Sequence, residues 1–450
     1  MKAKALLFTI LYFLSLSSLA QIEGYWKGTL ELGTQQLEVG FDMKGNDSLS
    51  ITLDVPAQVA FDIPAEGCFK DNILTINISS IEAKYQGMLN DGKINGTFTQ
   101  NGMDLPLELA KSEKQQVKKE RSQDPKEPYG YVTEDVFFEN TTDGITLAGT
   151  LTIPQGEGPF PAVVLVSGSG TQNRNEEMMN HRPFLVIADY LTRHGIAVLR
   201  YDDRGFAPSQ GDASTATSAD LANDAQAAFD YLMSRKETDQ NNIGIIGHSE
   251  GGMINFMVAA REPKVAFIIS LAGPAVKGSD ILKQQKRDIL KAQGFSDEAI
   301  DFSTAEDRKI FDIVEKSNDI DEARAEMGKL LKQDGFTPEL IEQTVEHVCQ
   351  PWMYYFIRHD PTDDIVATQC PALLMNGTKD LQVSATQNFT RFKKIAKQHH
   401  KKNLVIRKMK GLNHFFQHCD KGLLSEYIEI DETIAPEALE MMRKFIVRRK

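Results

Sequence analysis

The stretch that decides the fold is Ile243-Gly244-Ile245-Ile246-Gly247-His248-Ser249-Glu250-Gly251-Gly252. Its first four residues form a short apolar run, which is typical of a buried strand. The next residues, Met253 to Ala260, are mostly apolar and long enough to begin a helix. A serine between two glycines at a strand-to-helix turn is the pattern of a nucleophile elbow, which exposes the serine hydroxyl at the end of the strand. Glycines at 247 and 251 remove the side chains that would collide in so tight a turn.

Apolar runs and helical patterns alternate on both sides of this stretch. The other runs that we interpret as strands are Ala162–Val166, Ile196–Leu199, Val265–Ile269, Pro371–Met375 and Leu404–Ile406. Segments with a helical period lie between or after them, at Phe184–His194, Leu221–Met233, Ala385–Ala396 and Pro436–Val447. Strands without polar alternation are typical of a parallel sheet that is covered by helices on both faces. The sequence therefore predicts an α/β domain over residues 131–450.

A helical insertion interrupts this alternation at about residues 274–369. Ser303-Thr304-Ala305-Glu306 has the form of a capping box, which predicts the start of a helix at that point. Thr337-Pro338-Glu339 places proline at the first helical position after a threonine N-cap, and Gly335 can end the preceding helix. We expect the insertion to form a helical cap over the edge of the sheet where the elbow lies.

A small all-β domain is predicted over residues 21–112, where apolar residues recur at every second position, for example at Leu49, Ile51 and Leu53. Asn90-Asp91-Gly92 suits a hairpin turn between two such segments. These features favour a barrel or a sandwich, in which we expect Trp26 to be a core or edge residue, with binding of a sugar or lipid as the alternative. Residues 113–130 are charged and poor in large apolar side chains, so we interpret them as a linker.

The first 20 residues have the pattern of a secretory signal peptide. Lys2 and Lys4 form a basic segment, Ala5 to Leu16 is almost wholly apolar, and the small residue Ala20 suits cleavage by signal peptidase. The apolar stretch is short for a membrane span of about 20 residues, although an uncleaved anchor is the alternative. We therefore expect an exported protein, periplasmic or secreted, without stable membrane insertion.

Composition excludes some classes of partner and cofactor. The 450 residues carry 50 Lys and Arg against 63 Asp and Glu, a formal net charge of -13, and nucleic-acid binding needs a basic surface instead. The four cysteines, Cys68, Cys349, Cys370 and Cys419, are scattered and lack the spacing of a zinc site. We expect no metal and no organic cofactor. The composition leaves the oligomeric state and the disulfide pairing open.

A serine needs a base to remove its proton, and the base needs an acid that orients it. Gly377-Thr378-Lys379-Asp380 follows one predicted strand, and Gly411-Leu412-Asn413-His414 follows the next. Because the carboxyl ends of parallel strands meet at one edge of a sheet, Asp380 and His414 are expected near Ser249. The order serine, acid, histidine is also that of proteins with a nucleophile elbow.

Rival residues exist for both roles. His418 is the second candidate for the base, and His248, inside the elbow, is expected to pack or to form hydrogen bonds instead. Asp364 competes with Asp380, but it precedes its strand and therefore belongs to the opposite edge of the sheet.

A negative charge on the reacting oxygen would need two fixed N–H donors. We expect the N–H of Glu250, directly after the serine, and the N–H of Ser169 in Ser167-Gly168-Ser169-Gly170, with Gly170 as the second choice. Gly168 and Gly170 allow the backbone to approach a substrate closely. In the cap, the aromatic residues Trp352, Tyr354, Tyr355 and Phe356 are candidates for an acyl pocket, with Trp352 and Tyr355 chosen first, and packing of the cap on the core is the alternative.

These motifs together resemble the α/β-hydrolase superfamily, in particular the exported bacterial esterases of its dienelactone-hydrolase and prolyl-peptidase-like branch. The resemblance covers residues 131–450 and is carried by Ser167-Gly168-Ser169-Gly170, Arg200-Tyr201-Asp202-Asp203-Arg204-Gly205, the elbow, Gly377-Thr378-Lys379-Asp380 and Asn413-His414. It implies Ser249 as nucleophile, Asp380 as acid and His414 as base. One departure is Gly205-Phe206-Ala207-Pro208-Ser209, which lacks the second glycine that relatives often carry; this implies a reshaped loop beside an intact triad.

The resulting expectation is a serine hydrolase that cleaves small-molecule carboxylic esters through an acyl-enzyme on Ser249. A serine peptidase of aminopeptidase type uses the same three residues and is the main alternative. A thioesterase and a binding protein on a catalytically dead hydrolase fold are less favoured.

Overall fold

The computed structural model describes residues 22–32, 35–45, 49–56, 60–81, 83–100, 103–114 and 121–448. The chain forms two compact units, residues 1–118 and 119–450, and each is described by itself. The predicted signal peptide lies outside the described residues. Within the described residues, no helix combines the length and the apolar character that crossing a membrane requires.

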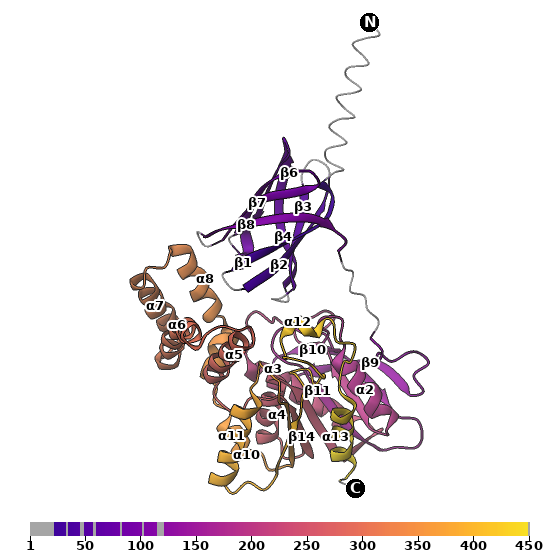
Figure 1. Cartoon of the computed structure of the whole chain (residues 1–450). Helices are drawn as coiled ribbons and strands as arrows, with labels where there is room; N and C mark the ends of the chain where they lie inside the picture. The colour runs from indigo at the N-terminus through magenta and orange to yellow at the C-terminus, as the bar shows by residue number, and fades with distance from the viewer. Residues whose placement is uncertain are drawn as a thin grey trace. The chain divides into compact units, whose positions relative to one another are not determined.

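The first unit is a closed barrel of eight strands in sequence order, each antiparallel to its neighbours (Figure 1). Its strands are β1 (Gly24–Leu32), β2 (Gln35–Lys44), β3 (Leu49–Val55), β4 (Ala60–Lys70), β5 (Ile73–Ile78), β6 (Ala83–Asn90), β7 (Lys93–Gln100) and β8 (Met103–Ser112). The predicted hairpin turn joins β6 and β7, with φ angles of 49° at Asp91 and 80° at Gly92. Positive φ at both positions is the geometry of a two-residue type I′ turn.

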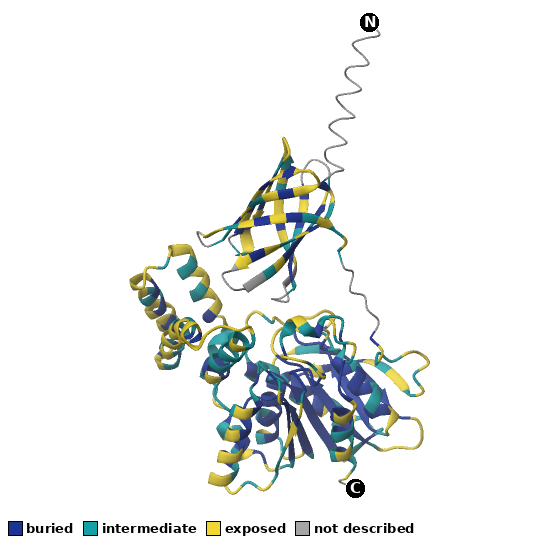
Figure 2. Cartoon of the chain, in the orientation of Figure 1, coloured by how far each residue is buried: buried dark blue, intermediate teal, exposed yellow. Residues whose placement is uncertain are grey.

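The interior of the barrel is filled by side chains. Buried and exposed residues alternate along the strands (Figure 2), so the sequence pattern of period two becomes a buried core. This core includes Trp26, Phe41 and Tyr85. The Tyr85 hydroxyl donates to the carbonyl of Ile94 at 3.1 Å or of Leu107 at 3.2 Å. Trp26 is 1% exposed, so it is a core residue of the barrel.

The second unit is built on an eight-stranded sheet with the order β16-β15-β14-β13-β11-β12-β10-β9. Six neighbouring strands are parallel, and β10 and β9 continue the sheet in antiparallel fashion. The bounds are β9 (Val132–Asn140), β10 (Ile145–Ile153), β11 (Phe160–Val166), β12 (Ala197–Tyr201), β13 (Thr238–His248), β14 (Phe267–Leu271), β15 (Ala372–Gly377) and β16 (Leu404–Met409). The predicted α/β fold is confirmed.

Helices cover both faces of this sheet (Figures 1 and 2). One face packs against α3 (Ser218–Ser234), α4 (Glu250–Arg261), α10 (Thr362–Ala367) and α11 (Ala385–Gln398). The other face packs against α2 (Pro183–Arg193) and α13 (Pro436–Val447), and a short helix, α12 (Leu424–Tyr427), precedes α13. Successive side chains of β11 explain why two cores form, because Val164 belongs to the first and Val163 and Leu165 belong to the second.

The insertion forms five helices with a small core of their own, followed by α10. The cap helices are α5 (Gly278–Ala292), α6 (Asp297–Lys316), α7 (Ile320–Gln333), α8 (Pro338–Val348) and α9 (Pro351–Arg358). Ile281 and Phe356 of the cap join Met253 of α4 and Val383 in one apolar cluster, which fixes the cap to the sheet unit. Ile365 of α10 instead belongs to the core beside α4, so α10 is part of the layer that covers the sheet.

Two predicted helix starts have different outcomes. Thr337 caps α8, and its side chain accepts the Leu340 N–H at 3.3 Å, as predicted. The predicted start at Ser303 is wrong, because Ser303 to Glu306 lie inside α6. That helix begins after Ser296, whose hydroxyl accepts the Ala299 N–H at 3.2 Å. Acidic residues in the first turn after Ser296 favour this earlier start through the helix dipole.

Candidate active site

The elbow has the strained geometry that its glycines predict. Strand β13 ends at His248, helix α4 begins at Glu250, and Ser249 between them has φ 53° and ψ -120°. A Cβ atom on Gly247 would lie 2.0 Å from the Gly251 carbonyl oxygen, and one on Gly251 would lie 2.2 Å from the Val166 carbonyl oxygen. Any side chain there would force the turn open. The elbow is therefore possible only with these glycines.

Asp380 and His414 are joined by a buried hydrogen bond. His414 Nδ1 lies 2.8 Å from Asp380 Oδ2, and the two residues are 3% and 5% exposed. The other carboxylate oxygen of Asp380 accepts the N–H groups of Gln382 and Val383 at 2.8 and 2.9 Å. An ionised carboxylate can only accept at Oδ2, so the proton resides on Nδ1 and Nε2 remains the basic nitrogen.

A cavity of about 230 Å³ contains the chemistry-bearing groups. Ser249 and His414 both line it, so the structure brings the predicted nucleophile and base to one site. The cap contributes apolar wall through Ile281, Trp352 and Phe356. Because the strands before Ser249, Asp380 and His414 are parallel, all three residues lie at the carboxyl edge of the sheet.

Two backbone N–H groups in the cavity wall are free to donate. Within the described part of the chain, neither the N–H of Ser169 nor that of Glu250 has an acceptor, whereas the Gly168 N–H donates to Glu176 at 2.8 Å. The loop that carries Ser169 is held by Asp203, whose side chain accepts the Ser167 hydroxyl at 2.7 Å. Two free N–H donors in the wall of the cavity that Ser249 lines are what an oxyanion hole requires.

Two of the predicted substrate-contacting residues lie elsewhere. Gly168 and Trp352 line the cavity, but Gly170 and Tyr355 do not. Tyr355 precedes Phe356 by one residue, and a helix turns by about 100° per residue, so the two rings leave α9 in different directions. The Tyr355 ring stacks on His359 at 5.4 Å between centroids, and Phe356 takes the predicted place in the wall.

The rival acid and base are also placed. Asp364 lies on α10, 3.4 Å from His359, outside the lining of the cavity. The imidazole of His418 pairs with Glu432 at 2.9 Å, and the side chain of His418 is 56% exposed. The hydrogen bond to Glu432 raises the pKa of His418 above its ordinary value. Neither residue lies beside Ser249.

Glu176 is a cavity residue that sequence reasoning missed. Its carboxylate is buried, and His248 Nδ1 lies 2.9 Å from Oε1. Burial acts to lower the pKa of His248, but the Glu176 carboxylate more than offsets this and the pKa is raised. No motif marks a lone glutamate in a loop, so the sequence signal was absent. The prediction that His248 forms hydrogen bonds agrees with this contact.

The side chain of Glu250 ties the elbow to the cap. Its carboxylate accepts the Trp352 indole N–H at 2.9 Å and the Ser218 hydroxyl at 2.6 Å. Burial raises the pKa of Glu250. The residue that is predicted to supply a backbone N–H thus also contacts cap helix α9 and the start of α3 through its side chain.

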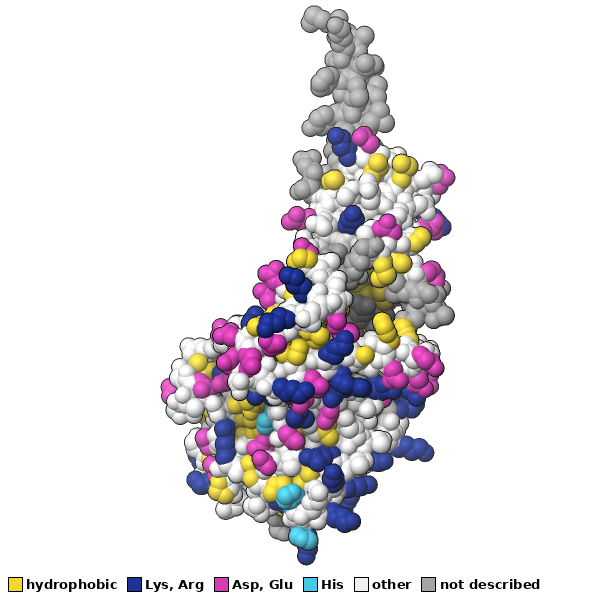
Figure 3. All heavy atoms as spheres, turned by 90° about the vertical axis from the view of Figure 1, so that its left-hand side faces the viewer, with side chains coloured by type: hydrophobic (Ala, Val, Ile, Leu, Met, Phe, Trp, Pro, Cys, Tyr) yellow, Lys and Arg dark blue, Asp and Glu magenta, His cyan; other side chains and the backbone are white. Residues whose placement is uncertain are grey.

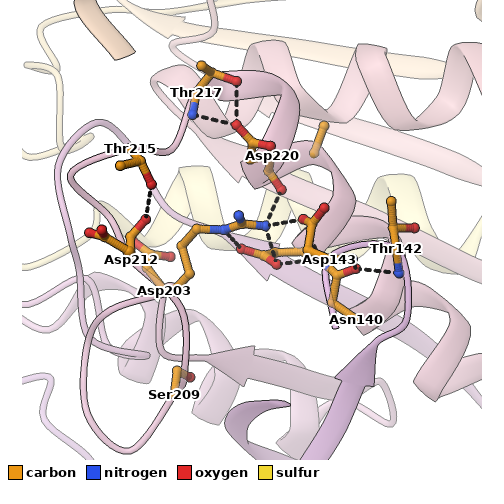
Figure 4. A network of polar contacts seen from close by, with 12 residues as sticks. Asn140, Thr142, Asp143, Asp203, Ser209, Asp212, Thr215, Thr217 and Asp220 are labelled. Carbon is orange, nitrogen blue, oxygen red and sulfur yellow. Dashed lines mark hydrogen bonds and ion pairs between the residues drawn. The ribbon is translucent and has the colours of Figure 1, made fainter. Parts of the chain in front are cut away.

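The Asp202-Asp203-Arg204-Gly205 motif builds a structural network (Figure 4). The Arg204 guanidinium donates to Asp224 at 2.7 Å, to Asp143 at 2.6 Å and to the Asp220 carbonyl at 2.8 Å. These bonds join the loop after β12 to the β9–β10 turn and to the first turn of α3. Asp203 of this motif also accepts the Ser167 hydroxyl, so the motif supports the loop that carries Ser169. None of its four residues lines the cavity.

In the described part of the chain, no group of three or more His, Cys, Asp or Glu side chains has an arrangement that could hold a metal ion. The reactive groups of the site are a serine, an imidazole, a carboxylate and backbone N–H groups.

A largely parallel sheet with this elbow, a following acid and a histidine at the same edge defines an α/β hydrolase. Residues 143–418 match the family model of the X-Pro dipeptidyl-peptidase (S15 family), which is more than half of the chain. The protein belongs to that family.

Similar proteins include esterases. The chain is 27% identical over 318 residues to Esterase EstD of Thermotoga maritima, covering 70% of this chain and 69% of that protein. It is 31% identical over 158 residues to Polyketide transferase claH of Penicillium crustosum, but covers only 46% of that protein. Among solved structures, the Pyrococcus furiosus esterase Pf2001 is 15% identical with a TM-score of 0.44, covering 71% of this chain and 92% of that one.

Proposed function

We propose that this protein is a serine hydrolase that cleaves carboxylic esters of small molecules through an acyl-enzyme on Ser249. The observation that carries the proposal is that His414 lines the same cavity as Ser249 while its Nδ1 lies 2.8 Å from the buried carboxylate of Asp380. The likeness to an enzyme named as an esterase favours an ester as substrate.

Each residue has a role that follows from its position. Ser249 Oγ attacks the ester carbonyl while His414 Nε2 takes its proton, and the oxyanion that forms is stabilised by the N–H groups of Ser169 and Glu250. The imidazolium returns the proton to the departing alcohol, which leaves the acyl group on Ser249. Water, deprotonated by the same nitrogen, then releases the acid. Asp380 fixes the imidazole and stabilises its charged form.

A serine peptidase is the second candidate, because the family takes its name from a dipeptidyl-peptidase. The same residues would attack an amide, and the leaving amine would take the proton from His414. The choice between the two reactions rests on the leaving group, an alcohol in one case and an amine in the other.

Labelling and a substrate panel test the proposal together. We expect a fluorophosphonate to label the wild type at Ser249 and not Ser249→Ala, with Ser214→Ala, in an exposed loop, as the labelled control. We expect turnover of p-nitrophenyl esters. Turnover of X-Pro p-nitroanilides without ester hydrolysis would replace the esterase by the peptidase, and the absence of labelling would reject a serine hydrolase. Ser249→Ala should lose roughly 10³-fold or more in kcat.

We also propose that the chain is exported, with cleavage after Ala20. The basic Lys2 and Lys4 and the apolar Ala5 to Leu16 support this. Cell fractionation and N-terminal sequencing test the proposal of export, and a cytoplasmic chain that retains Met1 or Lys2 would contradict it.

Charges of both signs are interspersed on the face drawn in Figure 3, which suits a small-molecule substrate better than a nucleic acid.

A further inference from the structure

A second acid–imidazole pair lies directly beside the first. Glu176 and His248 are 2% and 5% exposed, and Glu176 Oε1 lies 2.9 Å from His248 Nδ1. His248 Nε2 lies 3.0 Å from the carbonyl oxygen of His414, and the two imidazole rings are 4.6 Å apart between centroids. The pair therefore contacts the loop that carries the proposed base, although neither member belongs to the proposed triad.

The acceptors around His248 fix its protons. A carbonyl oxygen can only accept, so Nε2 of His248 carries a proton and donates to His414. Glu176 Oε1 also accepts the Gly168 N–H at 2.8 Å, so it acts as an acceptor on that side as well. Nδ1 faces Glu176 Oε1, so both ring nitrogens of His248 are placed to donate when the ring is protonated, and the raised pKa of His248 favours that form.

One hydrogen-bonded chain thus joins the two halves of the site. It runs from the Gly168 N–H through the Glu176 carboxylate and the His248 ring to the His414 carbonyl. Gly168 precedes Ser169, the proposed oxyanion donor, and a Cβ atom on Gly168 would lie 3.1 Å from the Ser249 Cβ. A shift of this loop would therefore move the donor relative to the nucleophile.

The backbone of Glu176 shows that its placement is costly. Its φ is 50°, in the left-handed region that residues other than glycine seldom adopt. Its second oxygen, Oε2, is buried and accepts no hydrogen bond from the described residues. Strain and an unpaired buried oxygen persist only where the surrounding contacts compensate for them, and such positions cluster at functional sites.

We propose that Glu176 and His248 act as a positioning pair that holds the oxyanion-hole loop and the His414 loop at the spacing required for acyl transfer. This inference rests on the proposed function. The pair touches no reacting atom in the mechanism above. Its effect is on the transition state, because the Ser169 donor must lie about 3 Å from the developing oxyanion.

Matched substitutions in two His–Glu pairs test this role. Glu176→Gln keeps the size of the side chain and an acceptor for Gly168, and His248→Phe keeps a ring but removes both donors. The pair His418–Glu432, also at 2.9 Å and with an exposed imidazole, provides the controls Glu432→Gln and His418→Phe. For each chain we would measure kcat and KM on the substrate that the wild type turns over, fluorophosphonate labelling at Ser249, and the thermal midpoint.

We expect Glu176→Gln and His248→Phe to lower kcat by about tenfold or more with little change in KM, as loss of a transition-state interaction requires. The kcat of the double variant should be about that of the less active single variant, because the effects of residues that act as one unit are not additive. Both controls should match the wild type. The proposal would be overturned if the folded single variants kept the wild-type kcat. It would also be overturned if the loss of kcat in the double variant were the product of the losses in the two single variants.

Three further results are decisive. If Glu176→Gln fails to fold, the pair is structural and the proposal is overturned. If KM rises while kcat stays unchanged, the pair affects binding and the proposal is again overturned. If the wild type is neither labelled at Ser249 nor active on esters or amides, the proposed function itself fails, and this outcome is distinct because it appears before any variant is compared.

Discussion

Asp203 is a buried acid whose protonation links stability to pH. Its carboxylate accepts the Ser167 hydroxyl and the Gln172 N–H, yet burial raises its pKa from an ordinary 3.8 to about 8. Between these values the folded chain holds a proton that the unfolded chain has released, so stability is lost as pH rises from about 4 towards 8. The slope is on the order of 1 kcal/mol per pH unit at most.

Asp203→Asn imitates the protonated acid and removes this linkage. We therefore expect the thermal midpoint of Asp203→Asn, taken relative to the wild type, to be higher at pH 8 than at pH 5. Asp212→Asn, at an exposed position in the following loop, is the control and should show no such difference. Parallel pH profiles for Asp203→Asn and the wild type would mean that Asp203 is ionised throughout this range.

At the scale of the element, helix α9 connects the cap to the elbow through Trp352. Trp352→Phe keeps the stacking on Phe356, which is 5.2 Å between centroids, but removes the donor to Glu250. Loss of a hydrogen bond costs about 0.5–1.5 kcal/mol net, so we expect KM to rise about two- to tenfold as the cap wall loosens. Steady-state kinetics of Trp352→Phe would measure this change.

Tyr355→Phe is the matched control on the same helix, because its ring lies outside the cavity. Its kinetics should equal those of the wild type. If Tyr355→Phe raised KM while Trp352→Phe did not, the face of α9 that carries Tyr355 would be the one that meets substrate, and the role given to Trp352 would be wrong.

The individual elements also show how much of the structure could be predicted from the sequence. The strand, elbow and helix around Ser249 were predictable because each needs a local pattern, and the glycine contacts explain why that pattern is so restricted. The face of α9 that lines the cavity was not predictable, since the six adjacent aromatic or apolar residues from Trp352 to Ile357 give no unique direction. The role of Glu176 was not predictable, because it depends on contacts with Gly168 and with His248, and His248 is distant in sequence.

Across the whole α/β unit, residues at its N-terminal end hold loops near its C-terminal end. Arg121 is 1% exposed, and its guanidinium donates to the carbonyls of Ile430 at 2.6 Å and of Ile428 and Met179 at 2.9 Å. Gln123 continues this contact by donating to the Ile434 carbonyl at 2.7 Å. The Met179 loop is the one that carries Glu176, so the segment that enters the unit supports the cavity wall.

Arg121→Ala should therefore lower both stability and activity. It leaves three part-buried carbonyls without their donor, and a hydrogen bond contributes about 1 kcal/mol net, so we expect a loss on the order of 3 kcal/mol. Arg121→Lys keeps the charge but not the planar guanidinium, so its stability and activity should lie between those of the wild type and those of Arg121→Ala. Thermal unfolding and kcat/KM measure the effects, with Lys402→Ala, at an exposed position, as control. If Arg121→Ala unfolded at the wild-type temperature, the Met179 loop would have to be held by its own contacts, and kcat/KM would then stay unchanged as well.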